Sequence, residues 1–341
     1  MAFNALIMNY IGSKYSLLPF LDSTIKDVVG DDLHDKVFCD IFAGTGIVGR
    51  SFKPRVRKVI ANDWEYYSYV LNRNYIGNHL ELDGKEECLA QLNNLSGDCN
   101  GFIYKNYCLG SGSGRQYFSD ENGKKIDAVR SHIEEWRVNG SISEDMYFFL
   151  LASLLESADK LANTASVYGA FLKHLKRTAQ KPLKLEPASY TVNEHEHEVY
   201  CSDANDLIKR IEGDVLYLDP PYNSRQYGAN YHLLNTIAEY KPFLPKGKTG
   251  LRDYEKSLYC GKNTVLSSFA DLIKDANFKY IILSYNNEGL MSLRDIENTM
   301  VQYGHYEMFS KEYQRFRADK EEKRNHRANK TIEYLHVLEK A

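Results

Sequence analysis

The chain has 341 residues, of which 43% are hydrophobic and 26% are charged, and its formal net charge at pH 7 is −3. This is the composition of a globular protein with about two domains, or with one large domain that carries an insertion. The small negative charge excludes a uniformly basic nucleic-acid-binding chain, so any contact with phosphates must come from local clusters of lysine and arginine.

The cysteines and the N-terminal segment indicate the cellular setting. None of the six cysteines forms a C-x-x-C pair, which argues against a zinc knuckle or a redox dithiol. Their irregular spacing in a long chain is typical of reduced thiols in a cytosol. Residues 1–10 lack the pattern of a signal peptide, and the most apolar stretch, residues 146–155, is too short to span a bilayer. We therefore expect a cytoplasmic protein with no membrane association.

The first part of the chain predicts a β-α-β unit, because short apolar runs alternate with helical patterns. In chain order the expected elements are a helix at 17–28, a strand at 36–41, a glycine turn at 43–46, a helix at 47–53, a strand at 57–61 and a helix at 64–75. Pro54 ends the helix at 47–53, since proline cannot continue the hydrogen-bond ladder.

The middle of the chain, residues 81–195, has no repeated strand pattern. A flexible glycine-serine stretch at 110–114 precedes helices expected at 124–138, 144–160 and 168–180. This region therefore predicts a helical insertion. It would interrupt a domain made of residues 1–80 and 196–341.

The strand pattern resumes in the last part of the chain. Strands are expected at 199–202, 215–218 and 280–284, followed by an antiparallel hairpin of strands at 305–309 and 332–338. Glutamate and histidine alternate over residues 194–198, but the spacing of metal ligands is absent. We interpret this run as a charged loop that enters a strand, and we expect no metal site.

The glycine turn is the first candidate for chemistry. Gly44 and Gly46 follow a strand and open a helix, so the backbone can approach a ligand closely and helix-start amides can hold an anionic group. With Gly49 they also satisfy G-x-G-x-x-G, so a dinucleotide site and a purely structural turn are both alternatives. Asp63, at the end of the next strand, can accept hydrogen bonds from ribose hydroxyls, or it can cap a helix.

The second candidate is Asp219-Pro220-Pro221-Tyr222, directly after the strand at 215–218. Two successive prolines fix an extended backbone and remove two amide donors. The Asp219 carboxylate and the Pro220 carbonyl are then acceptors without a local donor, which suits an amino group. Tyr222 offers a face on which a flat base could stack. The alternative is a turn that ends a strand.

These motifs, together with Tyr-Ile-Gly-Ser-Lys at residues 10–14, resemble the ordered motifs of the D12 class of adenine-specific DNA methyltransferases. Taken alone, Lys14 reads as a solvated lysine. The resemblance extends over most of the chain, and the further stretches that carry it are residues 115–119, 162–164, 167–173, 223–227 and 284–288.

The resemblance implies a Rossmann-like class I methyltransferase sheet, mostly parallel with a late antiparallel strand, and a helical insertion that recognises the target sequence. It implies an S-adenosylmethionine site lined by Tyr10, Gly12, Lys14, Asp40, Phe42, Ala43, Gly44, Gly46, Asp63 and Asp203. The target-adenine site would comprise Asp219, Pro220, Pro221 and Tyr222.

The implied reaction is methyl transfer from S-adenosylmethionine to the N6 amino group of adenine in a short sequence of double-stranded DNA. The base would be flipped out, and the methyl group would pass directly in line to the nitrogen. A cognate restriction endonuclease is the implied functional partner. Basic residues that could contact phosphates, or could simply be solvated, are Lys173, Lys176, Arg177, Arg225, Arg315, Arg317 and Arg324.

Three other functions remain open from the sequence. An RNA amino-methyltransferase shares the chemistry, and some such enzymes carry Asp-Pro-Pro-Tyr, usually without the Tyr-x-Gly-x-Lys element at residues 10–14. A nicotinamide dehydrogenase would explain Gly44 to Gly49 but gives Asp219 no role. A non-catalytic DNA-binding protein with the same fold would not need an intact motif at Asp219 to Tyr222.

Overall fold

The computed structural model describes residues 12–314 and 330–341, and the chain divides into two compact units. The sheet unit consists of Ser13–Trp64, His195–Gln226 and Lys256–Ala341. The helical unit consists of Glu65–Glu194 and Tyr227–Glu255, together with Gly12. Within the described ranges, no helix combines the length and the apolar character that a membrane span requires.

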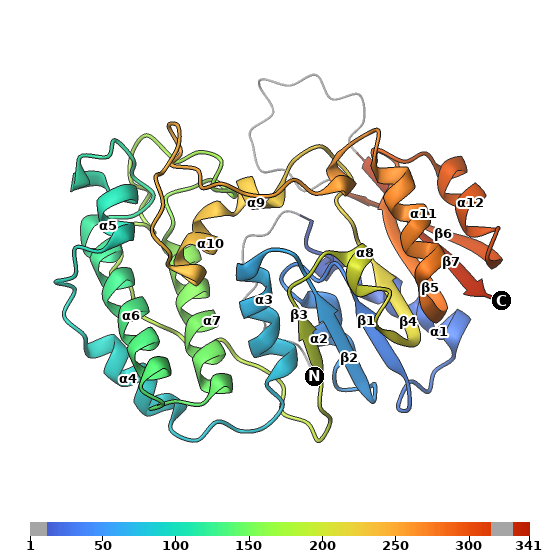
Figure 1. The fold of residues 1–341 in the computed structure, drawn as a ribbon, viewed down its shortest axis with the longest axis horizontal. Helices are drawn as coiled ribbons and strands as arrows, with labels where there is room; N and C mark the ends of the chain where they lie inside the picture. The colour runs from blue at the N-terminus through green and yellow to red at the C-terminus, as the bar shows by residue number, and fades with distance from the viewer. Residues whose placement is uncertain (1–11, 315–329) are drawn as a thin grey trace. The chain divides into compact units, whose positions relative to one another are not determined.

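Seven strands form one sheet in the order β3-β2-β1-β4-β5-β7-β6 (Figure 1). Their bounds are β1 Val37–Asp40, β2 Lys58–Asn62, β3 Glu198–Tyr200, β4 Glu212–Leu218, β5 Asn277–Asn286, β6 Gly304–Gln314 and β7 Lys330–Lys340. Strands β1 to β5 pair in parallel, and β7 is antiparallel to both of its neighbours. The mostly parallel Rossmann-like sheet with a late antiparallel strand, expected from the sequence, is confirmed.

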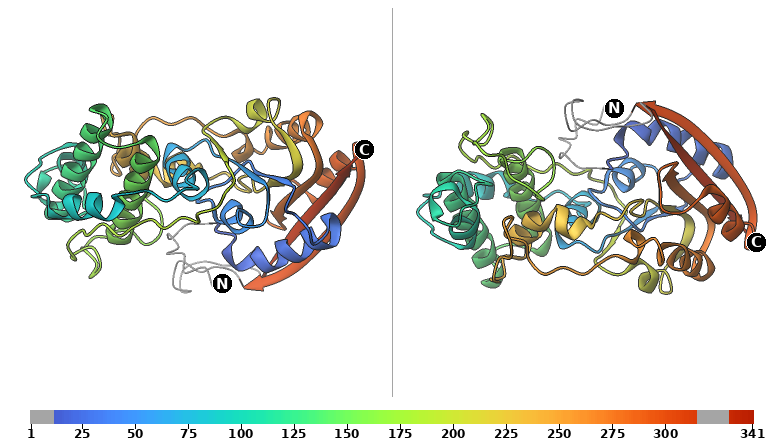
Figure 2. Two further views of the ribbon diagram at one scale, coloured as in Figure 1. Left: turned by 90° about the horizontal axis from the view of Figure 1, so that it is seen from below. Right: turned by 90° about the horizontal axis from the view of Figure 1, so that it is seen from above.

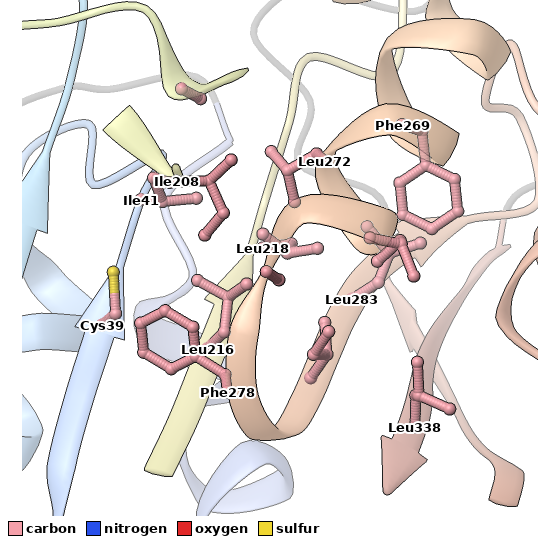
Figure 3. Packing of buried hydrophobic residues seen from close by; sticks show 14 of the residues in the cluster. Cys39, Ile41, Ile208, Leu216, Leu218, Phe269, Leu272, Phe278, Leu283 and Leu338 are labelled. Carbon is pink, nitrogen blue, oxygen red and sulfur yellow. The ribbon is translucent and has the colours of Figure 1, made fainter. Parts of the chain in front are cut away.

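Helices cover both faces of this sheet, and Figure 2 shows α1 and α11 on opposite sides of it. The helices of the sheet unit are η1 Tyr15–Leu17, α1 Leu18–Val29, α2 Ile47–Phe52, α8 Ala204–Leu207, η4 Leu258–Cys260, α11 Val265–Asp275 and α12 Leu293–Met300. Figure 3 shows the core under α11, where Phe269 and Leu272 lie with Leu283 of β5. Successive strand residues point to opposite faces, so every second residue of β1, β4 and β5 contributes to this core.

The other helices of the described residues belong to the helical unit, and the sequence predicted its two longest ones. Its helices are α3 Tyr66–Asn72, the π-helical turn η2 Arg73–Gly77, α4 Lys85–Asn94, α5 Phe102–Tyr107, η3 Leu109–Ser111, α6 Asp120–Val138, α7 Glu144–Leu161, α9 Tyr227–Asn230 and α10 His232–Glu239. Helix α6 begins before the expected residue 124, because the Ser119 hydroxyl accepts a hydrogen bond from the Asn122 amide and caps it.

The helix expected at residues 168–180 is wrong, because the structure has turns and no helix there. Its backbone groups are bound by other segments instead. The Tyr168 amide donates to the Asn230 carbonyl, and the amides of Leu172 and Lys176 donate to the carbonyl and the side-chain oxygen of Asn163. These non-local partners satisfy donors that a helix would have paired internally.

The two compact units divide the chain at points that differ from the limits 1–80, 81–195 and 196–341 expected from the sequence. Helices α3 and α10 belong to the helical unit, although the sequence pattern grouped both with the sheet. Asn235 of α10 joins them, since its side chain accepts from the Tyr67 amide at 2.9 Å and donates to Glu65 at 2.5 Å.

Candidate active site

The candidate site lies at the carboxyl ends of β1 and β4, which are neighbours in the centre of the sheet. From β1 the chain proceeds to β2 and β3 on one side, whereas β4 leads to β5 on the other side. Open α/β sheets bind ligands at such a switch point. Asp40 is the last residue of β1, and Asp219 directly follows β4.

Strand alternation places four polar side chains on the face of the sheet opposite the core of Figure 3. Asp40 is in register with Tyr217, and Asn286 is in register with Glu333. Residues paired in register share a face, and so do residues two apart in one strand. Asp40, Tyr217, Ser284 and Glu333 therefore project to the same side as Asp219.

A lysine from the N-terminal segment joins two of these acids. The Lys14 ammonium lies 3.0 Å from Asp219 Oδ1 and 3.3 Å from Glu333 Oε1, and the exposed fractions of the three side chains are 7%, 18% and 1%. The Ser284 hydroxyl donates to Glu333 Oε1 at 2.5 Å. The sequence predicted a role for Lys14 and Asp219, but it gave no signal for Glu333.

Lys14, Asp219 and Glu333 form a charge cluster, and the charges in it change the pKa values of Lys14 and Asp219. Burial works against the charge on Lys14, but the carboxylates of Asp219 and Glu333 outweigh it and hold the pKa of Lys14 well above its usual value. Burial raises the pKa of Asp219 to about 6; the Lys14 ammonium opposes this rise and the Glu333 carboxylate adds to it. Asp219 is therefore mostly ionised at pH 7, yet more basic than an ordinary aspartate.

The three residues after Asp219 are two prolines and a tyrosine. Pro220 is buried and Pro221 is partly buried, and neither brings an N–H. The Tyr222 ring is partly buried against the core, and its centroid lies 5.7 Å from the Lys14 ammonium. Asp219 and Tyr222 thus lie together with Lys14, which the sequence interpretation had assigned to the methyl-donor site and not to this motif.

The glycine turn is tied to the acids at the two strand ends. Gly44 and Gly46 have φ values of 53° and 74°, which favour glycine. The Gly44 amide donates to Asp63 Oδ2 at 2.8 Å, and the Gly49 amide of α2 donates to Asp40 Oδ2 at 3.2 Å. Both carboxylates therefore fix the shape of the turn between β1 and α2.

Asp40 Oδ1, at the end of β1, and Ser13 Oγ, in the segment before Lys14, are buried polar atoms without a hydrogen-bond partner among the described residues. Asp40 is only 1% exposed. Burial raises its pKa to about 8, with the charges of Asp219 and Asp63 adding to the shift and the Gly49 N–H opposing it. Because buried polar groups are almost always paired, each of these two atoms could accept or donate a hydrogen bond to a polar ligand.

Other predicted residues lie around the same strand ends. The Asp203 carboxylate caps α8 by accepting from the amides of Asn205 and Asp206, so its visible role is structural. Phe42 contacts the edge of the Tyr259 ring at 4.9 Å, and Ala43 is buried in the turn.

Asn62 is a residue that the sequence interpretation missed. It links the end of β2 to the chain after β1 and β3, because its amide group donates to the Ile41 and Ser202 carbonyls and accepts from the Ser202 amide. Its position beside Asp63 is the one signal that could have identified it.

The predicted basic residues are only partly described. Lys173, Arg177 and Arg225 are exposed, whereas the Lys176 ammonium donates to the Thr164 carbonyl at 2.9 Å. Lys173, Lys176 and Arg177 lie in turns rather than on an inserted helix. Tyr10, Arg315, Arg317 and Arg324 lie outside the described residues.

The run of alternating glutamate and histidine at residues 194–198 contacts strand β2. His197 accepts a hydrogen bond from the Val59 amide, and Glu198 pairs with Lys58. Within residues 12–314 and 330–341, no group of three or more histidine, cysteine, aspartate or glutamate side chains is arranged to hold a metal ion.

Comparison with known proteins identifies the family of the chain. Residues 10–299 match the model of the D12 class N6 adenine-specific DNA methyltransferase family. The chain is 63% identical to the type II methyltransferase M.NlaIII of Neisseria lactamica, over 98% of this chain and 99% of that protein. It is 38% identical to the type II methyltransferase M.CviAII of Paramecium bursaria Chlorella virus 1, over 91% and 93% of the two chains.

A third relative is longer than this chain. The type II methyltransferase M.FokI of Planomicrobium okeanokoites is 39% identical over 98% of this chain but only 53% of its own length. The family model covers most of the chain, and the relatives match it nearly from end to end. The chain therefore belongs to the D12 class of N6 adenine-specific DNA methyltransferases.

Proposed function

We propose that this adenine-specific DNA methyltransferase uses S-adenosylmethionine as its methyl donor and methylates an adenine that is flipped out of double-stranded DNA within a short sequence. Membership of the family supports methyl transfer to the N6 atom of adenine in DNA. It does not favour an RNA methyltransferase, a nicotinamide dehydrogenase or a non-catalytic DNA-binding protein.

The residues at the strand ends suit the methyl donor. Asp40 Oδ1 and Ser13 Oγ are buried and have no hydrogen-bond partner in the part of the chain that the structure describes, and the ammonium and carboxylate of the donor's amino-acid end would supply both partners. Asp63 already accepts from Gly44, and a carboxylate has room for further hydrogen bonds, such as those from ribose hydroxyls. We assign Tyr10, Gly12, Lys14, Phe42, Ala43, Gly46 and Asp203 to the same site on the family resemblance.

Asp219 carries the chemistry in this proposal. When bound, S-adenosylmethionine supplies a methyl group activated by its sulfonium. The adenine amino nitrogen is a poor nucleophile because its lone pair is delocalised into the ring. Asp219 and the Pro220 carbonyl would accept the two amino hydrogens and favour a tetrahedral nitrogen, while Pro221 keeps the loop rigid. As positive charge develops on that nitrogen, the Asp219 carboxylate stabilises it.

The target adenine has to leave the duplex to reach Asp219, since its amino group is paired inside the helix. Tyr222 offers a partly buried ring beside Asp219 on which the flipped base would stack. What the chain then has to provide is alignment, because holding two reacting groups in line removes much of the entropic barrier to direct transfer.

The wider setting of the reaction is also part of the proposal. The relatives are named type II methyltransferases or modification methylases, which supports modification of DNA alongside a cognate restriction endonuclease in the cytoplasm. The helical insertion would read the target sequence. Lys173, Lys176, Arg177, Arg225, Arg315, Arg317 and Arg324 are the candidates for phosphate contacts.

The observation that carries the proposal is the position of Asp219, at the switch point of the sheet and beside Lys14. The test is to incubate unmethylated plasmid DNA with the purified protein and S-adenosylmethionine, and to map modified bases by single-molecule sequencing. N6-methyladenine at one recurring short sequence is the expected result. Methylation of RNA alone, or of another base, would refute the proposal, as would calorimetry that detects NAD binding but no binding of S-adenosylmethionine.

A further inference from the structure

Glu333, the fourth residue of β7, is a buried acid that the family motifs do not include, since the family match ends at residue 299. We propose that Glu333 is a positioning residue for methyl transfer, which divides the Lys14 ammonium between two carboxylates and so keeps Asp219 available to the adenine amino group. This inference rests on the proposed role of Asp219.

Burying the Glu333 carboxylate costs free energy that its partners must offset. The side chain is 1% exposed and projects to the same face of the sheet as Leu335 and Val337, both of which are buried. An ionised carboxylate is expensive to bury unless it is paired and hydrogen-bonded. Glu333 has both kinds of partner, because Lys14 lies 3.3 Å away and the Ser284 hydroxyl donates at 2.5 Å. An apolar residue would fill this position without needing any partner.

The pairing of Glu333 with Lys14 changes how strongly Lys14 binds Asp219. An ammonium group has three donors in a compact charge. Its two carboxylate neighbours come from different parts of the chain, Asp219 after β4 and Glu333 on β7. With Asp219 as its sole acid, Lys14 would bind that carboxylate more tightly and draw electron density from it. Sharing the cation leaves Asp219 a stronger acceptor.

The negative charge of Glu333 also acts on Asp219 itself. The Glu333 carboxylate raises the pKa of Asp219, in opposition to Lys14. Several ionisable groups act on one another around Asp219. They come from the N-terminal segment, the strands β1, β4 and β7, and the loops after β2, β4 and β5, and they are Lys14, Asp40, Asp63, Tyr217, Tyr222, Glu288 and Glu333. Of this set, Lys14 and Glu333 act directly on Asp219, so removing the charge of Glu333 should make Asp219 less basic.

The test is Glu333→Gln, which keeps the size of the side chain and an oxygen that can accept from Ser284. Single-turnover methyl transfer would be measured from pH 5 to pH 9 with saturating DNA and S-adenosylmethionine. The acidic midpoint of the rate profile should move to lower pH than in the parent. The plateau rate should fall about tenfold, as expected when one charged hydrogen bond is weakened. Cofactor affinity should stay within about twofold of the parent, because Glu333 acts on the rate of transfer.

The matched control is Glu339→Gln on the same strand, where the side chain is 46% exposed and pairs with Lys279. It should leave both the midpoint and the plateau unchanged. If Glu333→Gln does not fold, Glu333→Asp retracts the carboxylate by one methylene and should shift the midpoint in the same direction by less.

A folded Glu333→Gln enzyme with the parental midpoint and plateau would overturn the inference, and so would a Glu333→Asp enzyme with an unshifted midpoint. The variant Asp219→Ala separates this failure from failure of the proposed function. If Asp219→Ala is inactive while Glu333→Gln behaves as the parent, only the role of Glu333 is wrong. If Asp219→Ala is fully active, the proposed function fails as well.

Discussion

Replacing Lys14 by methionine removes the cation from the charge cluster and keeps most of the side-chain volume. Methyl transfer in our account needs an ionised Asp219, so the rate should fall as the pH drops through the pKa of that group, which is about 6 in the parent. Without Lys14, the Asp219 and Glu333 carboxylates lose the ammonium group that pairs with both of them. The pair should then bind its first proton at higher pH. The acidic limb of the rate profile therefore moves upward.

The size of this shift can be bounded from the structure. Two unit charges 3.0 Å apart interact by about 5 kcal/mol at an effective dielectric constant of about 20, which corresponds to roughly four pKa units. Because the Asp219 side chain is 18% exposed, hydration offsets much of that energy. We expect the pKa of Asp219 to rise by at least about one unit, so that transfer at pH 7 falls by nearly half or more and recovers towards pH 9.

The assay is single-turnover transfer of a tritiated methyl group to DNA between pH 5 and pH 9. The methyl donor must be saturating, because Lys14 also belongs to the proposed donor site, and its affinity should be measured for each variant. Lys26→Met is the matched control, since Lys26 pairs with Asp22 on the surface of α1. An unshifted acidic limb in a folded Lys14→Met enzyme, or a shift to lower pH, would refute the reasoning.

Two further predictions concern the substrate. Tyr222→Ala should lower the rate of DNA methylation by about tenfold to a hundredfold, since stacking of a base on an aromatic ring contributes roughly 1–3 kcal/mol. Tyr222→Phe should retain most of the activity, and equal losses in the two variants would contradict a stacking role. Replacing Lys173, Arg177 or Arg225 by glutamine should reduce the salt dependence of DNA affinity by a slope of about 0.9 for each phosphate that the side chain neutralises, as measured by fluorescence anisotropy at several salt concentrations. A parental slope in all three variants would show that these side chains are merely solvated.

The sheet could be predicted from the sequence because the residues that specify each strand and the turn after it are adjacent in the chain. Strands in a covered parallel sheet are short apolar runs, and the runs at 36–41 and 215–218 end in turns with distinctive residues. The carboxyl ends of neighbouring parallel strands meet at one edge, so the glycine turn and Asp219 could be expected to lie together. The late hairpin was also visible as two apolar runs separated by a charged stretch.

Long-range pairing could not be predicted in the same way. Glu333 is one of two acids in β7, and the role of its carboxylate depends on Lys14, which lies near the other end of the chain. The predicted helix at 168–180 failed for a related reason, because Asn163 and Asn230 bind its backbone donors. The grouping of α3 with α10 likewise depends on Asn235, whose hydrogen bonds no sequence pattern reveals.

The most direct test of the central claim is methyl transfer by Asp219→Ala, with affinity for S-adenosylmethionine measured in parallel. The variant removes no apolar core volume, and Glu333 remains to hold Lys14, so the sheet unit should fold normally. The account predicts that transfer to DNA falls by about a hundredfold or more, by analogy with the loss of one preorganised hydrogen-bonding group, while cofactor affinity changes little. A folded Asp219→Ala protein that methylates DNA at the parental rate would contradict it.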